Sequence, residues 1–123
     1  MKIIIADDEF ANRLLISEIV KELGHELIEV ENGKEAIVAI QQNNDIDLVL
    51  MDIEMPVMNG MEAARQIRER MQYPKNKIPI IAITGHNQGI FPEDCRNIGF
   101  DYFLNKPYSI DKFTQVLDHY NKV

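Results

Sequence analysis

The sequence predicts one α/β domain spanning residues 1–123, built as a doubly wound, five-stranded parallel sheet flanked by helices. Two observations favour this fold. Short β-branched runs alternate along the chain with longer segments of helical period, which is the pattern of βαβ units. The chain has 123 residues, of which 46% are hydrophobic and 27% charged, and this is the size and apolar content of a single globular domain.

The first two strands, each followed by a helix, are expected in residues 2–42. The first strand is Lys2 to Ala6, and the helix after it has an i, i+3, i+4, i+7 apolar stripe closed by Gly24. A second, weaker strand spans Glu26 to Val30, and the next helix spans Gly33 to Gln42. The inward residues are predicted to be Ile16, Ile19, Val20 and Leu23 in the first helix, and Ala36, Ile37 and Ile40 in the second.

The middle of the chain contributes a third strand, Asp47 to Asp52, and a fourth, Ile80 to Ile83. The third strand is apolar at four successive positions, which suits a strand covered on both faces. Between the two strands we expect a helix from Gly60 to Met71 and a loop from Tyr73 to Pro79. The inward residues of this helix are predicted to be Ala63, Ala64, Ile67 and Met71.

The last part of the chain begins with its least regular segment, residues 85–99. Gly89 and Pro92 oppose a long helix there, so we expect a short or late-starting one. The fifth strand is Asp101 to Asn105, and Ser109 is suited to N-cap a final helix. The inward residues of that helix are predicted to be Ile110, Phe113, Leu117 and Tyr120.

The expected strand order is 2-1-3-4-5, the flavodoxin-like arrangement, with right-handed helical crossovers. In such sheets the ligand site lies at the carboxyl ends of the strands, near the switch in strand order. The residues at those ends are Asp7, Asp8 and Glu9 after the first strand, Asp52 after the third, Thr84 after the fourth and Lys106 after the fifth. Carboxylates, a hydroxyl and an ammonium group therefore converge on one rim.

Charge and composition exclude several function classes. The chain has 13 Lys and Arg against 20 Asp and Glu, a net charge of −7, so direct nucleic-acid binding is not expected. Cys95 is the only cysteine, which rules out an intrachain disulfide and fits a reducing compartment. The apolar run at residues 3–6 meets acidic residues too soon for a signal peptide, and no stretch approaches membrane-spanning length. We expect a cytoplasmic domain.

The acidic rim is suited to phosphoryl chemistry. Carboxylates crowded at strand ends repel one another, and a hard divalent cation, Mg²⁺ above all, keeps them ionised. Lys106 and Thr84 supply a positive charge and a hydrogen-bond donor for phosphoryl oxygens. Asp52, at the end of the most buried strand, is the best-placed nucleophile to form an aspartyl-phosphate. Each of these residues alone is commonly part of a turn or a cap, and it is their joint occurrence that favours a site.

The motifs on this rim resemble one known family. They are Asp7-Asp8, the segment 51–60 that reads Met-Asp-Ile-Glu-Met-Pro-Val-Met-Asn-Gly, the junction Ile83-Thr84-Gly85, and Lys106-Pro107. Together, and in this order over essentially the whole chain, they resemble the receiver domain of two-component response regulators.

The resemblance implies the roles of the phosphoryl site. Asp52 matches the aspartate that takes a phosphoryl group from a phosphohistidine. Mg²⁺ would be held by Asp7, Asp8 and Asp52, with the main-chain carbonyl of Glu54 as a further ligand. Lys106 matches the lysine that contacts the phosphoryl oxygens.

The resemblance also implies a switch. Thr84 matches the hydroxyl residue that moves towards the phosphoryl group, and Phe103 stands where the family has its switching aromatic ring. The peptide bond between Lys106 and Pro107 is expected to be cis, an isomer that only proline makes accessible at low cost. Glu54, and His86 at the mouth of the site, are expected to modulate the lifetime of the phosphoryl group.

Finer features are similar to the receivers attached to hybrid sensor histidine kinases. The spacing of Thr84-Gly-His86, Cys95, Gly99, Asp101, Phe103-Leu104 and Lys106-Pro107 follows that subgroup. Two departures are Gly85, where alanine is common, and residues 89–92, where the subgroup has a more helical segment. The second departure affects the fourth helix and leaves the phosphorylation chemistry untouched.

The leading hypothesis is a phosphorylation-driven signalling domain. It would act as a phosphoacceptor, with only weak self-phosphorylation and autodephosphorylation activity. Its phosphoryl donor would be a sensor histidine kinase or a histidine phosphotransfer protein. A downstream protein would detect the surface formed by the fourth helix, fifth strand and fifth helix, and neither nucleic acid nor a membrane is an expected partner.

Three alternatives remain open on the sequence. An aspartyl-nucleophile phosphatase of the haloacid dehalogenase type carries a second aspartate two residues after the nucleophile, where this chain has Glu54. A receiver-like binding module that is never phosphorylated is the second alternative, although the acid pair, Asp52, Thr84 and Lys106 are all present. A flavin-binding protein of the same fold ranks last, because no Ser/Thr/Gly-rich phosphate loop follows Ala6.

Overall fold

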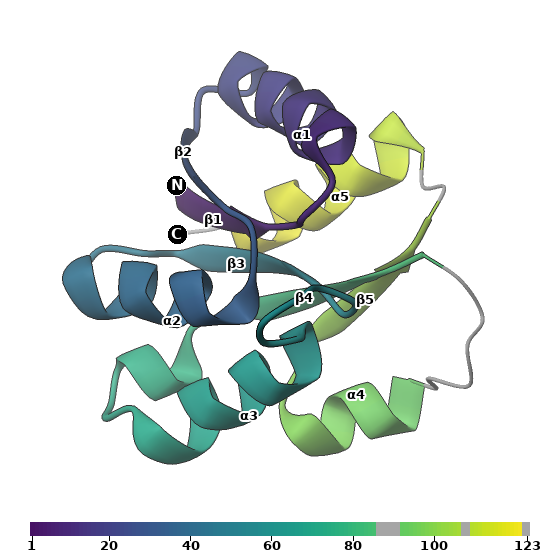
Figure 1. Ribbon diagram of the computed structural model, residues 1–123. Helices are drawn as coiled ribbons and strands as arrows, with labels where there is room; N and C mark the ends of the chain where they lie inside the picture. The colour runs from purple at the N-terminus through teal and green to yellow at the C-terminus, as the bar shows by residue number, and fades with distance from the viewer. Residues whose placement is uncertain (86–91, 107–108, 122–123) are drawn as a thin grey trace.

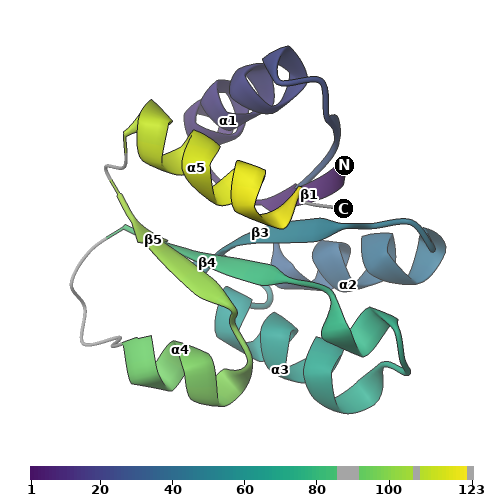
Figure 2. The same ribbon diagram turned by 180° about the vertical axis from the view of Figure 1, so that it is seen from behind.

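The computed structural model describes residues 1–85, 92–106 and 109–121, which form one parallel sheet with helices on both faces (Figures 1 and 2). The strand order β2-β1-β3-β4-β5 confirms the predicted topology. The strands are β1 Lys2–Ala6, β2 Glu26–Val30, β3 Leu48–Asp52, β4 Ile80–Thr84 and β5 Tyr102–Asn105. The helices are α1 Phe10–Glu22, α2 Gly33–Gln42, α3 Gly60–Arg70, α4 Pro92–Ile98 and α5 Ile110–Tyr120, with a short 3-10 helix η1 at Lys75–Lys77.

The two faces of the sheet carry separate halves of the core. Helices α1 and α5 cover one face, and α2, α3 and α4 cover the other (Figures 1 and 2). Alternate residues of a central strand serve the two faces: Ile3 and Ile5 of β1 cluster with α1 and α5, whereas Ile4 clusters with α2 and α3. Every residue of β3 and of β4 is buried. The unalternating apolar pattern therefore did indicate strands covered on both sides.

Side-chain caps fix where three of the helices begin. The side chains of Asn32, Asn59 and Ser109 accept hydrogen bonds from the backbone N–H three residues later, at 2.9, 2.8 and 3.0 Å. Each bond satisfies a donor that the first turn of a helix leaves without a partner. The predicted N-cap at Ser109 is confirmed.

Two residues predicted to face the core are exposed. Leu23 is 40% exposed and Ile110 is 59% exposed, so both predictions were wrong. Leu23 is the C-cap residue of α1 and Ile110 is the first residue of α5, so each lies at the end of its helix. In α5 the buried stripe begins one turn later, at Phe113. Periodicity identifies the inward face of a helix but not the point at which the helix extends past the sheet.

The connections differ in detail from the sequence prediction. The predicted loop from Tyr73 to Pro79 contains η1, because the backbone N–H groups of Lys77 and Ile78 donate to carbonyls three residues earlier. Helix α4 has seven residues and begins at Pro92, as expected of a short, late helix. Proline is accommodated there because the first turn of a helix needs no bonded N–H.

The start of α3 is packed directly onto the end of β3. The backbone N–H of Gly60 donates to the carbonyl of Ile53 at 2.9 Å. A Cβ atom at position 60 would overlap the main-chain oxygen of Asp52 and would lie 2.9 Å from Cγ of Met51. Glycine is therefore required for this close approach, which fixes the position of the last residue of β3.

Among the residues that the structure describes, no helix is long and apolar enough to cross a membrane.

Candidate functional site

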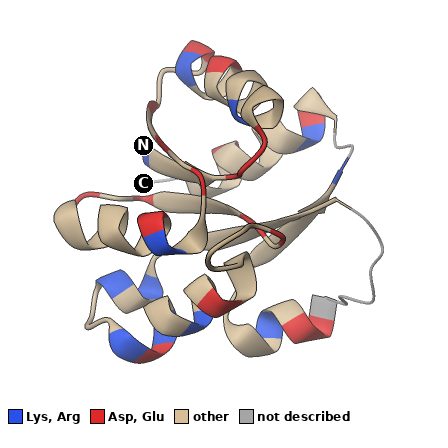
Figure 3. Ribbon diagram, in the orientation of Figure 1, with Lys and Arg blue, Asp and Glu red and all other residues tan. Residues whose placement is uncertain are grey.

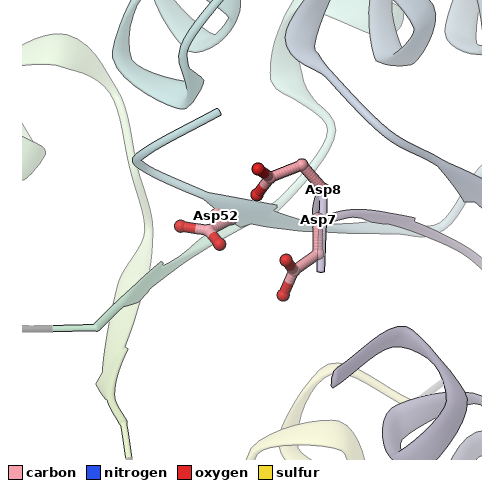
Figure 4. A group of neighbouring side chains, drawn as sticks. All are labelled: Asp7, Asp8 and Asp52. Carbon is pink, nitrogen blue, oxygen red and sulfur yellow. The ribbon is translucent and has the colours of Figure 1, made fainter. Parts of the chain in front are cut away.

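Three carboxylates meet at the carboxyl ends of two adjacent strands. Asp7 and Asp8 directly follow β1, and Asp52 is the last residue of β3. One carboxylate oxygen from each of the three lies within 4.8 Å of the others (Figure 4). Asp7 is completely buried and Asp52 is 6% exposed, whereas Asp8 is exposed. The parallel sheet therefore brings together the three acids that the sequence predicted to share a site.

The two buried carboxylates are held in the same way. Asp7 Oδ1 accepts a hydrogen bond from the backbone N–H of Glu9 at 2.9 Å, and Asp52 Oδ1 accepts one from the N–H of Glu54 at 3.0 Å. The Oδ2 atoms of Asp7 and Asp52 both face Lys106, whose Nζ lies 3.3 Å and 3.2 Å from them. Lys106 directly follows the edge strand β5, so a residue from the edge of the sheet bridges two acids at the ends of its inner strands.

Burial dominates the electrostatics of Asp52. Loss of solvent raises the pKa of Asp52 to about 6, Lys106 opposes this shift, and the neighbouring Asp7 adds to it. Burial also lowers the pKa of Lys106, but the carboxylates of Asp52 and Asp7 outweigh this effect and the net shift is upward. A single ammonium group thus faces two acids of the cluster, which leaves an excess of negative charge.

A cleft of about 1270 Å³ opens above these acids. Its lining is partly charged and partly apolar, since it combines Asp8, Glu9, Asp52 and Lys106 with Leu15, Met55 and Met61. Glu54, whose main-chain carbonyl is the predicted further metal ligand, also lines the cleft. Glu9 lies on the rim as predicted, but it is not part of the group formed by Asp7, Asp8 and Asp52.

Thr84 and Phe103, the predicted switch residues, are not among the described residues that line this cleft. Thr84 is the last residue of β4 and is 7% exposed. It is not among the described residues that line the cleft, whereas Gly85 and Lys106 are. Phe103 is half-buried and packs against the core on the side of α2, α3 and α4.

One contact of Thr84 was not predicted from the sequence. The hydroxyl of Thr84 donates a hydrogen bond of 2.6 Å to Oδ1 of Asn105. The signal was available in principle, because Thr84 directly follows the predicted fourth strand and Asn105 ends the predicted fifth, its neighbour in the sheet. The pairing became evident only with the β4–β5 register, which places Asn105 opposite Thr84.

Two predicted positions, His86 and the peptide bond before Pro107, lie outside the described residues. The rest of the predicted site can be assigned a chemistry. Closely spaced carboxylate oxygens are the ligands that hard divalent cations prefer. A buried aspartate beside an ammonium group is suited to attack phosphorus while the cation binds the oxygens of the transferred group.

Comparison with known proteins places these features in one family. The family described as "Response regulator receiver domain" matches residues 3–118. This match runs from within β1 to within α5 and includes all the carboxylates of the cluster as well as Lys106.

Two curated relatives are a histidine kinase and a sensor protein. Histidine kinase 5 of Arabidopsis thaliana is 34% identical over an alignment that covers 97% of this chain and 15% of the kinase. Sensor protein GacS of Pseudomonas syringae pv. syringae is 35% identical over 94% of this chain and 13% of that protein. The chain thus spans less than a fifth of the length of these relatives.

Two solved structures have the same fold. The receiver domain of a sensor histidine kinase from Pseudomonas aeruginosa PAO1, with a magnesium ion coordinated in its active site cleft, is 28% identical with a TM-score of 0.86. The alignment covers 97% of this chain and 95% of that domain. The chemotaxis protein CheY4 of Vibrio cholerae is 25% identical with a TM-score of 0.83, over 96% of each chain.

Proposed function

This chain belongs to the response regulator receiver domain family, and on that premise we propose that Asp52 accepts a phosphoryl group from a phosphohistidine. The observation that carries the proposal is the position of the Asp52 carboxylate. It ends β3 at the cleft, within 4.8 Å of oxygens of Asp7 and Asp8, and 3.2 Å from the ammonium group of Lys106. A nucleophile, a cluster suited to a cation and a fixed positive charge therefore meet at one point.

Mg²⁺ is the proposed cofactor, because the donor set fits it. Asp7, Asp8 and Asp52 offer carboxylate oxygens alone, and Lys106 offsets only part of their charge. The main-chain carbonyl of Glu54, on the segment after Asp52, is the proposed further ligand. When bound, the ion would withdraw electron density from the phosphoryl oxygens.

The proposed reaction forms one bond and breaks one. An oxygen of the Asp52 carboxylate attacks phosphorus, and the P–N bond of the phosphohistidine breaks. The electron pair of that bond stays on the imidazole nitrogen. The phosphohistidine reacts with its other ring nitrogen protonated, so the histidine leaves as a neutral imidazole. Lys106 is already 3.2 Å from Asp52 and is the group of this chain that would pair with the phosphoryl oxygens. Because the pKa of Asp52 is about 6, most molecules carry the ionised nucleophile at pH 7.

The proposed signal is a change in the surface formed by α4, β5 and α5. Thr84 is the last residue of β4, and Lys106 directly follows β5. These two strands connect the site with this surface. A hydrogen bond from the Thr84 hydroxyl to the phosphoryl group would move that side chain away from Asn105. Phe103, half-buried two residues before Asn105, would then repack. His86 and Glu54 are the proposed modulators of phosphoryl lifetime.

The proposed partners follow from the family. A histidine kinase or a histidine phosphotransfer protein supplies the phosphoryl group, and an unidentified downstream protein detects the α4-β5-α5 surface. We propose that residues 1–123 act as a single receiver domain with weak self-phosphorylation and autodephosphorylation. Cys95 is a buried free thiol, which is compatible with the cytoplasm, the proposed location.

Phosphoramidate tests this proposal, because its P–N bond resembles that of phosphohistidine. The parent protein, incubated with Mg²⁺, should gain the mass of one phosphoryl group per molecule. Asp52→Asn should gain none, whereas Asp45→Asn, a matched change of an exposed aspartate, should behave like the parent. Continuous release of phosphate without a persistent adduct would instead indicate an aspartyl phosphatase.

A further inference from the structure

Thr84 and Asn105 are joined by both main-chain and side-chain contacts at the end of the sheet. They are partners in the β4–β5 register, and they form its last pair. The N–H of Lys106 donates to the carbonyl of Thr84 at 2.7 Å, just beyond that pair. Beside this bond, the Thr84 hydroxyl donates to Asn105 Oδ1 at 2.6 Å. The residue next to Lys106 thus determines where the hydroxyl of Thr84 is directed.

While this hydrogen bond is formed, the Thr84 hydroxyl cannot donate to a second acceptor. A threonine hydroxyl has one proton and can donate it to one acceptor at a time. If Thr84 is to donate to a phosphoryl oxygen, its bond to Asn105 must break. Thr84 does not line the cleft with the described residues Gly85 and Lys106, so the orientation seen here is the one turned away from the site.

The two ends of the Thr84–Asn105 bond differ in exposure. Thr84 is 7% exposed, whereas Asn105 is exposed. Water can therefore replace the hydroxyl at Asn105 Oδ1 once the bond breaks, and Asn105 loses little. Phe103 lies two residues before Asn105 and so on the same side of β5, where it pairs in register with Ala82. Phe103 is therefore the next side chain along that face of β5 that a movement of Asn105 would affect.

We propose that Asn105 is a positioning residue that holds the Thr84 hydroxyl away from the phosphoryl site. The side chain at position 105 then sets how readily the domain adopts its phosphorylated conformation. The proposal rests on the proposed function, because it requires that Thr84 donates to a phosphoryl group on Asp52. The predicted effect is a gain: although a hydrogen bond is lost, removing the Asn105 side chain should favour the phosphorylated state.

Beryllofluoride with Mg²⁺ provides the test, because it imitates the phosphoryl group without covalent transfer. Asn105→Ala and Asn105→Leu both lack the acceptor, and they should bind beryllofluoride about fivefold more tightly than the parent. In Thr84→Val, which lacks the hydroxyl, the further change Asn105→Ala should leave the affinity unaltered. Asn44→Ala, the same change at an exposed asparagine elsewhere, should match the parent.

A second readout needs no bound ion. In metal-free protein, the amide signals of Phe103 in Asn105→Ala should lie part of the way from the free to the beryllofluoride-bound positions of the parent. A general loss of folding would lower the affinity and cannot produce these results. The proposal is overturned if the Asn105 variants bind with the parent's affinity, or if the gain persists in Thr84→Val. If the parent itself does not bind beryllofluoride, the proposed function fails first.

Discussion

The ammonium group of Lys106 lies 3.2 Å from Asp52 and 3.3 Å from Asp7, although the three residues lie at the ends of three different strands of the sheet. The ionisation of the Asp52 carboxylate therefore depends on a residue at the end of β5. This arrangement follows from a parallel sheet, because the carboxyl ends of β1, β3 and β5 all lie at one edge.

Replacing Lys106 with alanine should change both ionisation and chemistry. Lys106 lowers the pKa of Asp52, so its removal should raise that pKa above about 6. The rate of phosphorylation by phosphoramidate should fall about a hundredfold, because a charge-stabilising donor is lost. An NMR titration of the Asp52 carboxyl carbon measures the first effect. Lys112→Ala, at an exposed lysine of α5, should alter neither, and an unchanged Asp52 pKa in Lys106→Ala would contradict the assignment.

The raised pKa of Asp52 also predicts how stability depends on pH. Between its ordinary value of 3.8 and about 6, the folded state binds a proton that the unfolded state has released, so stability should fall as pH rises through this window. Asp52→Asn cannot ionise. Without divalent cations it should be more stable than the parent by about 3 kcal/mol at pH 7, and the difference should shrink towards pH 4. Denaturant unfolding in EDTA measures both, and a less stable Asp52→Asn at pH 7 would refute this explanation.

The affinity for Mg²⁺ should depend strongly on the cluster of Asp7, Asp8 and Asp52, and only weakly on the neighbouring Glu9. Asp8→Ala removes one of the three grouped carboxylates, and its affinity for Mg²⁺ should fall at least tenfold. Glu9→Ala removes a carboxylate that lines the cleft outside that group, so its effect should be small. Calorimetric titration compares the two. Equal losses in both variants would mean that only general charge attraction is at work.

Two glycines near the site should differ sharply in their tolerance of alanine. Gly60→Ala would bring Cβ into overlap with the main chain of Asp52 and should destabilise the fold by about 2 kcal/mol or more. Among the described residues, Gly85→Ala would meet only Cδ of Lys106, at 4.0 Å, and should be nearly neutral. Thermal unfolding distinguishes these outcomes. A well-tolerated Gly60→Ala would show that the β3–α3 connection can shift without cost.

The sequence was sufficient to predict the acid cluster and Lys106, because their positions depend only on strand order. Each residue ends or directly follows a strand that the sequence pattern predicts, and the parallel topology brings these strand ends together. The exposure of Leu23 and Ile110 was not predictable from periodicity, since both lie at helix ends.

Contacts that depend on strand register or on loop geometry were also beyond the sequence. The Thr84–Asn105 bond requires knowing which residues of β4 and β5 lie opposite each other. Arg68 is a second case: its guanidinium donates to the carbonyls of Gly99 and Asn76 and to the carboxylate of Asp101. This one side chain ties α3 to η1 and to the start of β5, and no local pattern indicates it. Figure 3 shows that α3 and the segment after it carry a group of basic residues, in which Arg68 was not distinguishable by sequence.

The most direct test of the proposed chemistry is to locate the phosphoryl group on the chain. The protein is incubated with Mg²⁺ and acetyl phosphate, the acyl phosphate is reduced with borohydride, and the modified residue is identified by peptide mass spectrometry. We predict one modified position, Asp52, which requires Mg²⁺ and disappears in Asp52→Asn. Modification at another residue, or an unchanged level in Asp52→Asn, would contradict the assignment of Asp52 as the phosphoacceptor.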